Sequence, residues 1–125
     1  MVNLLNPNLR VRDIRKLVEP NLMEINWDRG VDETSEWIVA SFENSEHTHR
    51  LTSWLNSKAI SGTFELIIIH DSWSNLEYVT WENLLENLQN YFDQKSTLII
   101  ASDRTWVMEY QPQQIVRFGR WLQVT

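Results

Sequence analysis

Apolar residues recur along this chain with the spacing of helices in three segments: residues 9–18, 45–58 and 81–92. Asn8, Ser45 and Thr80 are the expected N-caps, because short polar side chains accept the free N–H groups at the start of a helix. Pro20 prevents the first helix from continuing. The last segment carries one broad apolar stripe, formed by Trp81, Leu84, Leu85, Leu88, Tyr91 and Phe92.

Other segments have the pattern of β-strands. The segment 64–70 is apolar at consecutive positions, so we expect a strand that is buried on both faces in the middle of a covered sheet. The segment 36–42 fits either a strand or a capped helix, and we favour the strand. The remaining predicted strands are residues 22–27, 97–101, 105–110 and 115–119.

The order of these elements predicts an α+β fold. We expect about three helices packed on a mixed or mainly antiparallel sheet. The last three strands should form a meander, because their connecting loops are short. A length of 125 residues without repeats or a linker-like tract predicts a single domain over residues 1–125.

Composition limits the cellular environment that we expect and the kinds of chemistry that the chain could perform. The chain has no cysteine, which removes disulfides, thiolate catalysis and thiolate metal sites. No segment approaches the roughly 20 apolar residues of a membrane span, and the N-terminal residues lack the apolar core of a signal peptide. We therefore expect a cytoplasmic protein that binds no membrane and no cofactor; its oligomeric state stays open.

Charge is distributed unevenly along the sequence. Residues 31–94 carry eleven Asp/Glu and two Lys/Arg, whereas residues 1–30 carry four and five and residues 95–125 carry two and four. The formal net charge is −6. An acidic field repels nucleic acid and attracts basic proteins, so direct DNA or RNA binding is disfavoured and a basic protein partner is favoured.

Several acidic residues lie next to an aromatic one. Asp71, Trp73 and Glu77 fall in the predicted loop before the 81–92 helix, and Glu82 and Glu86 are one turn apart on its polar face. Such a surface can capture a basic protein, because charge steers the encounter and the indole ring supplies a desolvated contact. Among the seven tryptophans, Trp73 and Trp121 are the ones we expect to be exposed.

Two other clusters invite a chemical interpretation. His70 and Asp71 end the apolar strand, but adjacent strand residues point to opposite faces and would share a proton only if the chain turned between them. His47 and His49 are two apart on a predicted helix, where their imidazoles diverge by about 200°. We therefore expect no metal site and no catalytic residue.

The segments WENLLENLQNYF, STLIIAS, DRTWVMEY and IVRFG fall between residues 78 and 121. This stretch resembles small bacterial immunity proteins that neutralise polymorphic or contact-dependent toxins, in which a helix with a Trp- and Leu-rich stripe precedes strands carrying a Trp and a late glycine. The resemblance implies a stoichiometric inhibitor, often acidic because the toxin is often a basic nuclease. Such families share no catalytic residues.

The leading hypothesis is a non-enzymatic protein-binding module, an immunity-like inhibitor that occludes a basic toxin through Asp71, Trp73, Glu77, Glu82 and Glu86. One alternative is a small hydrolase or ligand-binding domain that uses His70 and Asp71 at the end of a strand. Another is an anti-defence protein whose acidic surface mimics the charge of a nucleic acid.

Overall fold

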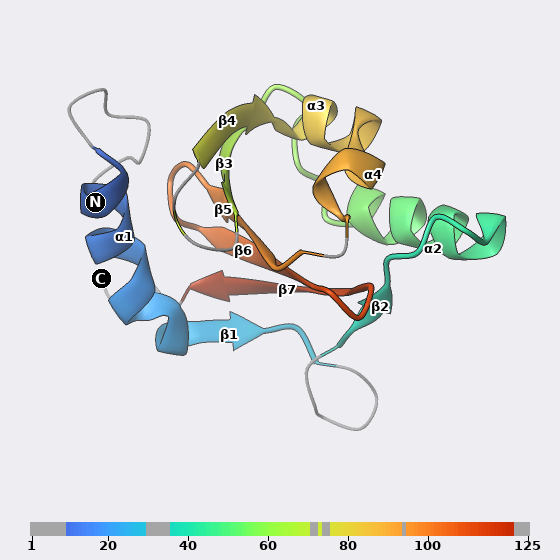
Figure 1. The fold of residues 1–125 in the computed structure, drawn as a ribbon, viewed down its shortest axis with the longest axis horizontal. Helices are drawn as coiled ribbons and strands as arrows, with labels where there is room; N and C mark the ends of the chain where they lie inside the picture. Colours follow the sequence, from blue (N-terminus) through green and yellow to red (C-terminus); the bar gives the residue numbers. More distant parts are fainter. Residues whose placement is uncertain (1–9, 30–35, 71–72, 74–75, 94, 122–125) are drawn as a thin grey trace.

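The chain forms one antiparallel sheet with helices on both faces (Figure 1). The computed structural model describes residues 10–29, 36–70, 73, 76–93 and 95–121. The strands follow the order β1-β7-β6-β5-β3-β4, and β2 also pairs with β7. Their bounds are β1 Ile25–Trp27, β2 Ile38–Val39, β3 Glu65–His70, β4 Leu76–Thr80, β5 Thr97–Ala101, β6 Trp106–Gln111 and β7 Ile115–Trp121.

Within the described residues there are four α-helices, one more than the sequence predicts, and one 3-10 helix that joins the first helix to β1. The α+β class, the mainly antiparallel sheet and the C-terminal meander are confirmed. The helix bounds are α1 Val11–Val18, η1 Glu19–Glu24, α2 Ser45–Asn56, α3 Trp81–Glu86 and α4 Leu88–Tyr91.

Strand β3 separates two hydrophobic clusters. Leu66 and Ile68 belong to the cluster beneath α2, α3 and α4, whereas Ile67 and Ile69 belong to the cluster beneath α1. All four side chains are at most 2% exposed. This confirms the predicted burial of both faces. It is strongly favourable, since burying an aliphatic side chain of this size stabilises a protein by about 1.5–3 kcal/mol.

The two faces of the sheet are covered by different numbers of helices. Figure 1 shows the sheet curving around α2, α3 and α4, with α1 on the other side. Trp81 and Leu84 anchor α3 in the larger cluster, and Ile14 and Val18 anchor α1 in the smaller one. Because α1 is only eight residues long, it covers one part of its sheet face and leaves Trp27 and Leu98 half-buried.

The helix starts differ from the predicted ones at two positions. The described chain begins at residue 10, so Asn8 lies outside it; the cap residue of α1 is Arg10, whose backbone N–H donates to the Asp13 carboxylate at 2.9 Å. Helix α2 is capped by Asn44 instead of Ser45, because the Asn44 side chain accepts the Glu46 N–H at 2.8 Å.

The predicted 81–92 helix starts as expected but is interrupted. Thr80 caps it, since its hydroxyl accepts the Asn83 N–H at 3.2 Å. Asn87 then leaves the helical conformation, and its side chain donates to the Asn83 carbonyl at 2.9 Å. Asparagine side chains compete with the helical hydrogen bonds in this way, which divides the segment into α3 and α4.

Three strand predictions need correction. Strand β4 occupies part of the predicted loop before the 81–92 helix, so Glu77 lies on a strand and not in a loop. The predicted strand 22–27 is extended only from Ile25, since the preceding residues form η1. The segment 36–42 contains a strand and not a helix, but only Ile38–Val39 pair with β7.

Tryptophan burial also departs from the expectation. Trp121, which we expected to be exposed, is 8% exposed, and its indole N–H donates to the Asn21 carbonyl at 2.8 Å. Trp37 is more open, at 36% exposed, and the Arg117 guanidinium lies over its ring and over that of Trp27, at 4.6 and 3.8 Å from the two centroids. Trp121 thus belongs to the hydrophobic cluster beneath α1.

Gly119 allows β1 to lie close against β7, because it has no side chain. A substitution at Gly119 therefore tests the packing between these two strands. A Cβ at Gly119 would lie 2.7 Å from Ile25 Cγ2 and 2.9 Å from a Trp27 ring carbon. Gly119→Ala should therefore lower the free energy of unfolding by about 1–3 kcal/mol, measured by urea denaturation. Gly62→Ala is the matched control, because its Cβ would meet Glu82 Cβ at an ordinary 3.4 Å. Equal losses in the two variants would contradict the close approach at Gly119.

Candidate partner-binding site

The structure brings some of the predicted binding residues together and separates others. Glu77 lies in β4 opposite Ile68, so it is on the sheet face that α2, α3 and α4 cover. Glu82 and Glu86 are exposed on α3, on the same side. Trp73 packs against the cluster on the opposite face, and Asp71 lies outside the described residues.

The orientation of Trp73 results from an uncommon backbone conformation. Its φ is 58°, in the left-handed region that bulky residues rarely occupy, and its N–H donates to the His70 carbonyl at 3.0 Å. This turn directs the ring toward α1, where the Arg15 guanidinium lies 5.6 Å from the ring centroid. Such a conformation costs of order 1–3 kcal/mol, which packing of the half-buried ring offsets.

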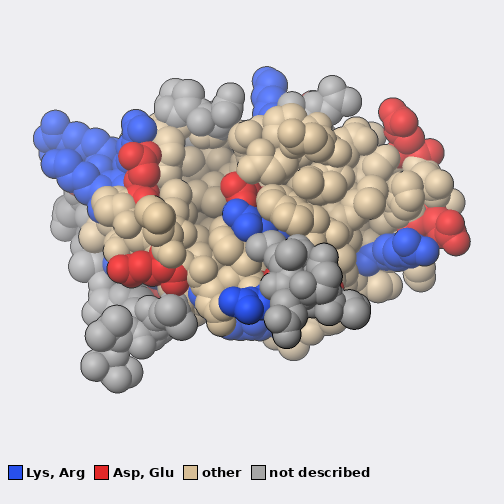
Figure 2. Space-filling view, turned by 90° about the horizontal axis from the view of Figure 1, so that it is seen from below, with Lys and Arg blue, Asp and Glu red and all other residues tan. Residues whose placement is uncertain are grey.

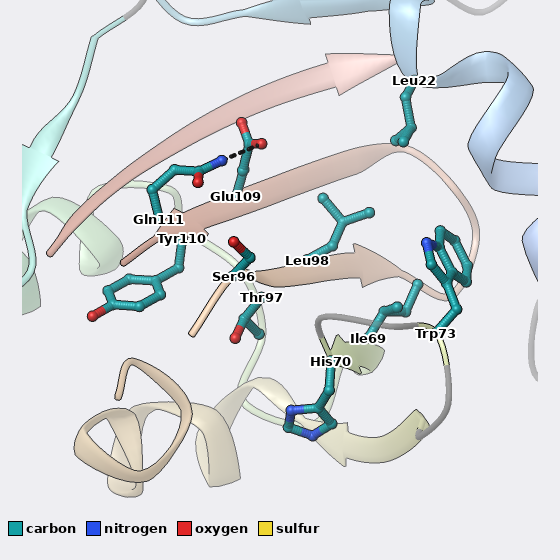
Figure 3. Close-up of a pocket in the computed structure, with 10 residues that line it drawn as sticks. All are labelled: Leu22, Ile69, His70, Trp73, Ser96, Thr97, Leu98, Glu109, Tyr110 and Gln111. Carbon is teal, nitrogen blue, oxygen red and sulfur yellow. Dashed lines mark hydrogen bonds between the residues drawn. The ribbon is translucent and has the colours of Figure 1, made fainter. Parts of the chain in front are cut away.

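Trp73 also borders a shallow pocket of about 150 Å³ on the α1 face. Figure 3 shows Leu22, Leu98 and Trp73 together at the apolar end of the pocket. Glu109 and Gln111, which hydrogen-bond to each other at 2.7 Å, form the polar end. The mixture of an indole, aliphatic side chains and one polar pair is typical of a contact surface more than of a reaction site.

His70 contributes to the pocket rim, but its imidazole is directed elsewhere. In Figure 3 the imidazole points away from Leu98 and Trp73. Its Nε2 lies 3.0 Å from Glu77 Oε1, across the β3–β4 pair. Glu77 also acts on Tyr91 of α4, where its negative charge contributes to a raised pKa of the phenol. This cluster is not predicted by the sequence pattern, because the pairing depends on a strand in a segment expected to be loop.

The surface from β3 to α4 carries negative charge without compensation. Residues 59–94 contain six Asp/Glu and no Lys or Arg. In the described part of the chain the ion pairs with Lys or Arg involve Asp13, Glu19, Asp28 and Glu109, all outside this segment. Among the described residues, no basic side chain therefore lies within ion-pair distance of Glu82 or Glu86, and their field extends into solvent.

Positive charge gathers elsewhere on the molecule. Helix α1 and its cap residue carry four basic side chains, and Figure 2 shows Lys and Arg together at the end of the molecule that α1 occupies. Two of these side chains pair with nearby acids, Arg10 with Asp13 of α1 and Arg15 with Glu19 at the start of η1. The charge asymmetry of the sequence thus becomes a spatial separation between α1 and the surface of β4 and α3.

Comparisons with protein-family models, curated proteins and solved structures find no match to this chain. No group of three or more potential metal ligands of the His, Cys, Asp or Glu type occurs among the described residues. The helices within the described ranges include none that is long and apolar enough to cross a membrane.

The Glu77–Tyr91 contact makes a prediction for alkaline titration. Burial, followed by the negative charge and hydrogen bond of Glu77, raises the pKa of Tyr91 above its ordinary value of 10.0. A raised pKa of this kind contributes stability below pH 10 that is lost as the pH rises further. Glu77→Gln should lower the pKa of Tyr91, as measured from phenolate absorbance after subtraction of a Tyr91→Phe titration. An unchanged Tyr91 pKa would show that the two side chains do not interact.

Proposed function

We propose that this chain is a non-enzymatic protein-binding module of the immunity type, which occludes a basic partner such as a toxin with the acidic surface of β4 and α3. The charge of Glu82 and Glu86, which pairs with no basic side chain among the described residues, carries the proposal. Carboxylates held near one another repel, and a partner that supplies Lys and Arg relieves that repulsion on binding.

The surface is well suited to a rigid contact. Helix α3 is fixed at its first residue, because Thr80 caps it and Trp81 is 2% exposed. The Glu82 N–H donates to the Gly62 carbonyl at 2.9 Å, which also ties the helix start to the loop between α2 and β3. Charges on a fixed scaffold lose less entropy on binding than charges on a mobile segment.

The acidic side chains act mainly on the rate of association. An exposed ion pair contributes only about 0.2–1 kcal/mol, so a few such pairs cannot provide high affinity. A one-signed surface does, however, steer a basic protein and raise the association rate constant by 10-fold or more at low ionic strength. The apolar part of the contact must supply the slow dissociation.

Charge reversal at α3 tests the proposal. Glu82→Lys/Glu86→Lys should slow association with the protein encoded by the neighbouring gene at least about tenfold at low salt, and should weaken the dependence on ionic strength. Stopped-flow or biolayer measurements give both quantities.

The matched control is Glu43→Lys/Glu46→Lys, which changes the net charge equally at exposed positions beside the start of α2. This start lies at the far end of the molecule from α1 (Figure 1). An equal effect of both double variants would assign the steering to net charge, and absence of any complex would reject the proposed function.

A further inference from the structure

The two edges of the sheet differ in how they are protected. One edge consists of β1 and β2, which are three and two residues long and are separated by residues 28–37. Short strands and interruptions of this kind prevent an edge from pairing with other chains. The other edge is β4, whose five residues pair with β3 in one continuous register. It contains neither proline nor lysine, the residues that commonly protect an edge.

The hydrogen-bond pattern fixes which backbone groups of β4 face outward. In an antiparallel pair, opposite residues alternate between bonded and non-bonded pairs. The Trp81 N–H donates to the Phe64 carbonyl at 2.8 Å, so Phe64 and Trp81 form a bonded pair. Bonded pairs recur at every second residue, so Val79 and Glu77 are also bonded to β3. The N–H and C=O groups of Leu76 and Tyr78 therefore point away from β3.

The hydrogen bonds between β3 and β5 lead independently to the same assignment of outward-facing groups on β4. The Ser102 N–H donates to the Glu65 carbonyl at 3.2 Å, so Glu65 directs its backbone groups toward β5. Glu65 lies opposite Thr80 in the β3–β4 register, which is accordingly a non-bonded pair. Within the described residues no backbone partner occurs for the outward groups of Tyr78.

The side chains along this edge specify what could pair with it. Tyr78 is 53% exposed and lies on the α1 face of the sheet, because it is opposite Ile67. Glu77 lies on the other face with 40% of its side chain exposed. A strand added to β4 would therefore meet an aromatic ring on one face and a carboxylate on the other.

The edge is also where the separated binding residues come within reach of one ligand. Trp73 and Tyr78 belong to the α1 face, whereas Glu77 and the α3 carboxylates belong to the opposite face. A partner that covers only one face cannot contact both groups. An extended segment lying along β4 reaches both faces, since its own side chains alternate between them.

We propose that β4 accepts an added strand from the partner protein, an extended segment in which basic residues alternate with apolar ones. The inference rests on the proposed function and identifies how the partner is held. Basic side chains would lie beside Glu77 and the α3 carboxylates, and apolar side chains beside Tyr78 and Leu76. A second copy of this chain fits less well, because it would bring two acidic edges together.

Substitutions at Tyr78 separate the backbone contribution from that of the ring. Tyr78→Pro removes the outward N–H and leaves the β3–β4 hydrogen bonds in place, and edge strands tolerate such a proline. Tyr78→Thr removes the ring but keeps the N–H. For a ten-residue peptide of alternating lysine and valine, measured by fluorescence anisotropy, Tyr78→Pro should bind roughly tenfold more weakly than Tyr78→Thr. A peptide of alternating glutamate and valine should not bind.

Amide hydrogen exchange provides a readout on the unaltered protein. The N–H of Tyr78 should exchange rapidly in the free protein and become protected by the lysine–valine peptide, while the N–H of Val79, already bonded to β3, should be protected in both states. Equal peptide affinities of the two variants, or no protection at Tyr78, would overturn strand addition. That failure is distinct from loss of the proposed function, which requires that the neighbouring gene product form no complex.

Discussion

The burial of β3 on both faces is the constraint on which the rest of the structure depends. Its four consecutive apolar residues cannot be covered by a single layer, so helices are required on each side of the sheet. Helix α1 provides one cover, and α2, α3 and α4 provide the other. The same strand connects β5 to β4, and its position therefore determines that β4 lies at an edge next to an acidic helix.

Local sequence signals predicted the elements whose stability is local. The apolar run of β3, the short loops of the C-terminal meander and the Thr80 cap were all visible, because each depends on residues close together in the chain. The three-dimensional cluster of His70, Glu77 and Tyr91 was not. Its formation requires a strand pairing and a helix position that no short pattern contains.

Side-chain direction was the other quantity that the sequence could not supply. Trp73 and Glu77 are four residues apart, yet they lie on different faces, because Trp73 has a positive φ and Glu77 follows the β3 register. Trp121 is near the end of the chain but pairs with Ile25 and enters the α1 core. Neighbouring positions in the sequence suggested one acidic and aromatic patch. In the structure these residues form two groups, one on each face of the sheet beside the edge strand β4.

An edge strand open to one partner has to be kept from pairing with every other chain. In β4 this protection comes from electrostatic repulsion, since the strand lacks proline and lysine and its neighbours are carboxylates. Repulsion depends on pH in a way that a steric block does not. At low pH, where carboxylates become protonated, this repulsion is lost and the exposed strand is expected to pair with other chains. Under the proposed function, the carboxylates that would bind the partner are therefore also the ones that protect this edge from other chains.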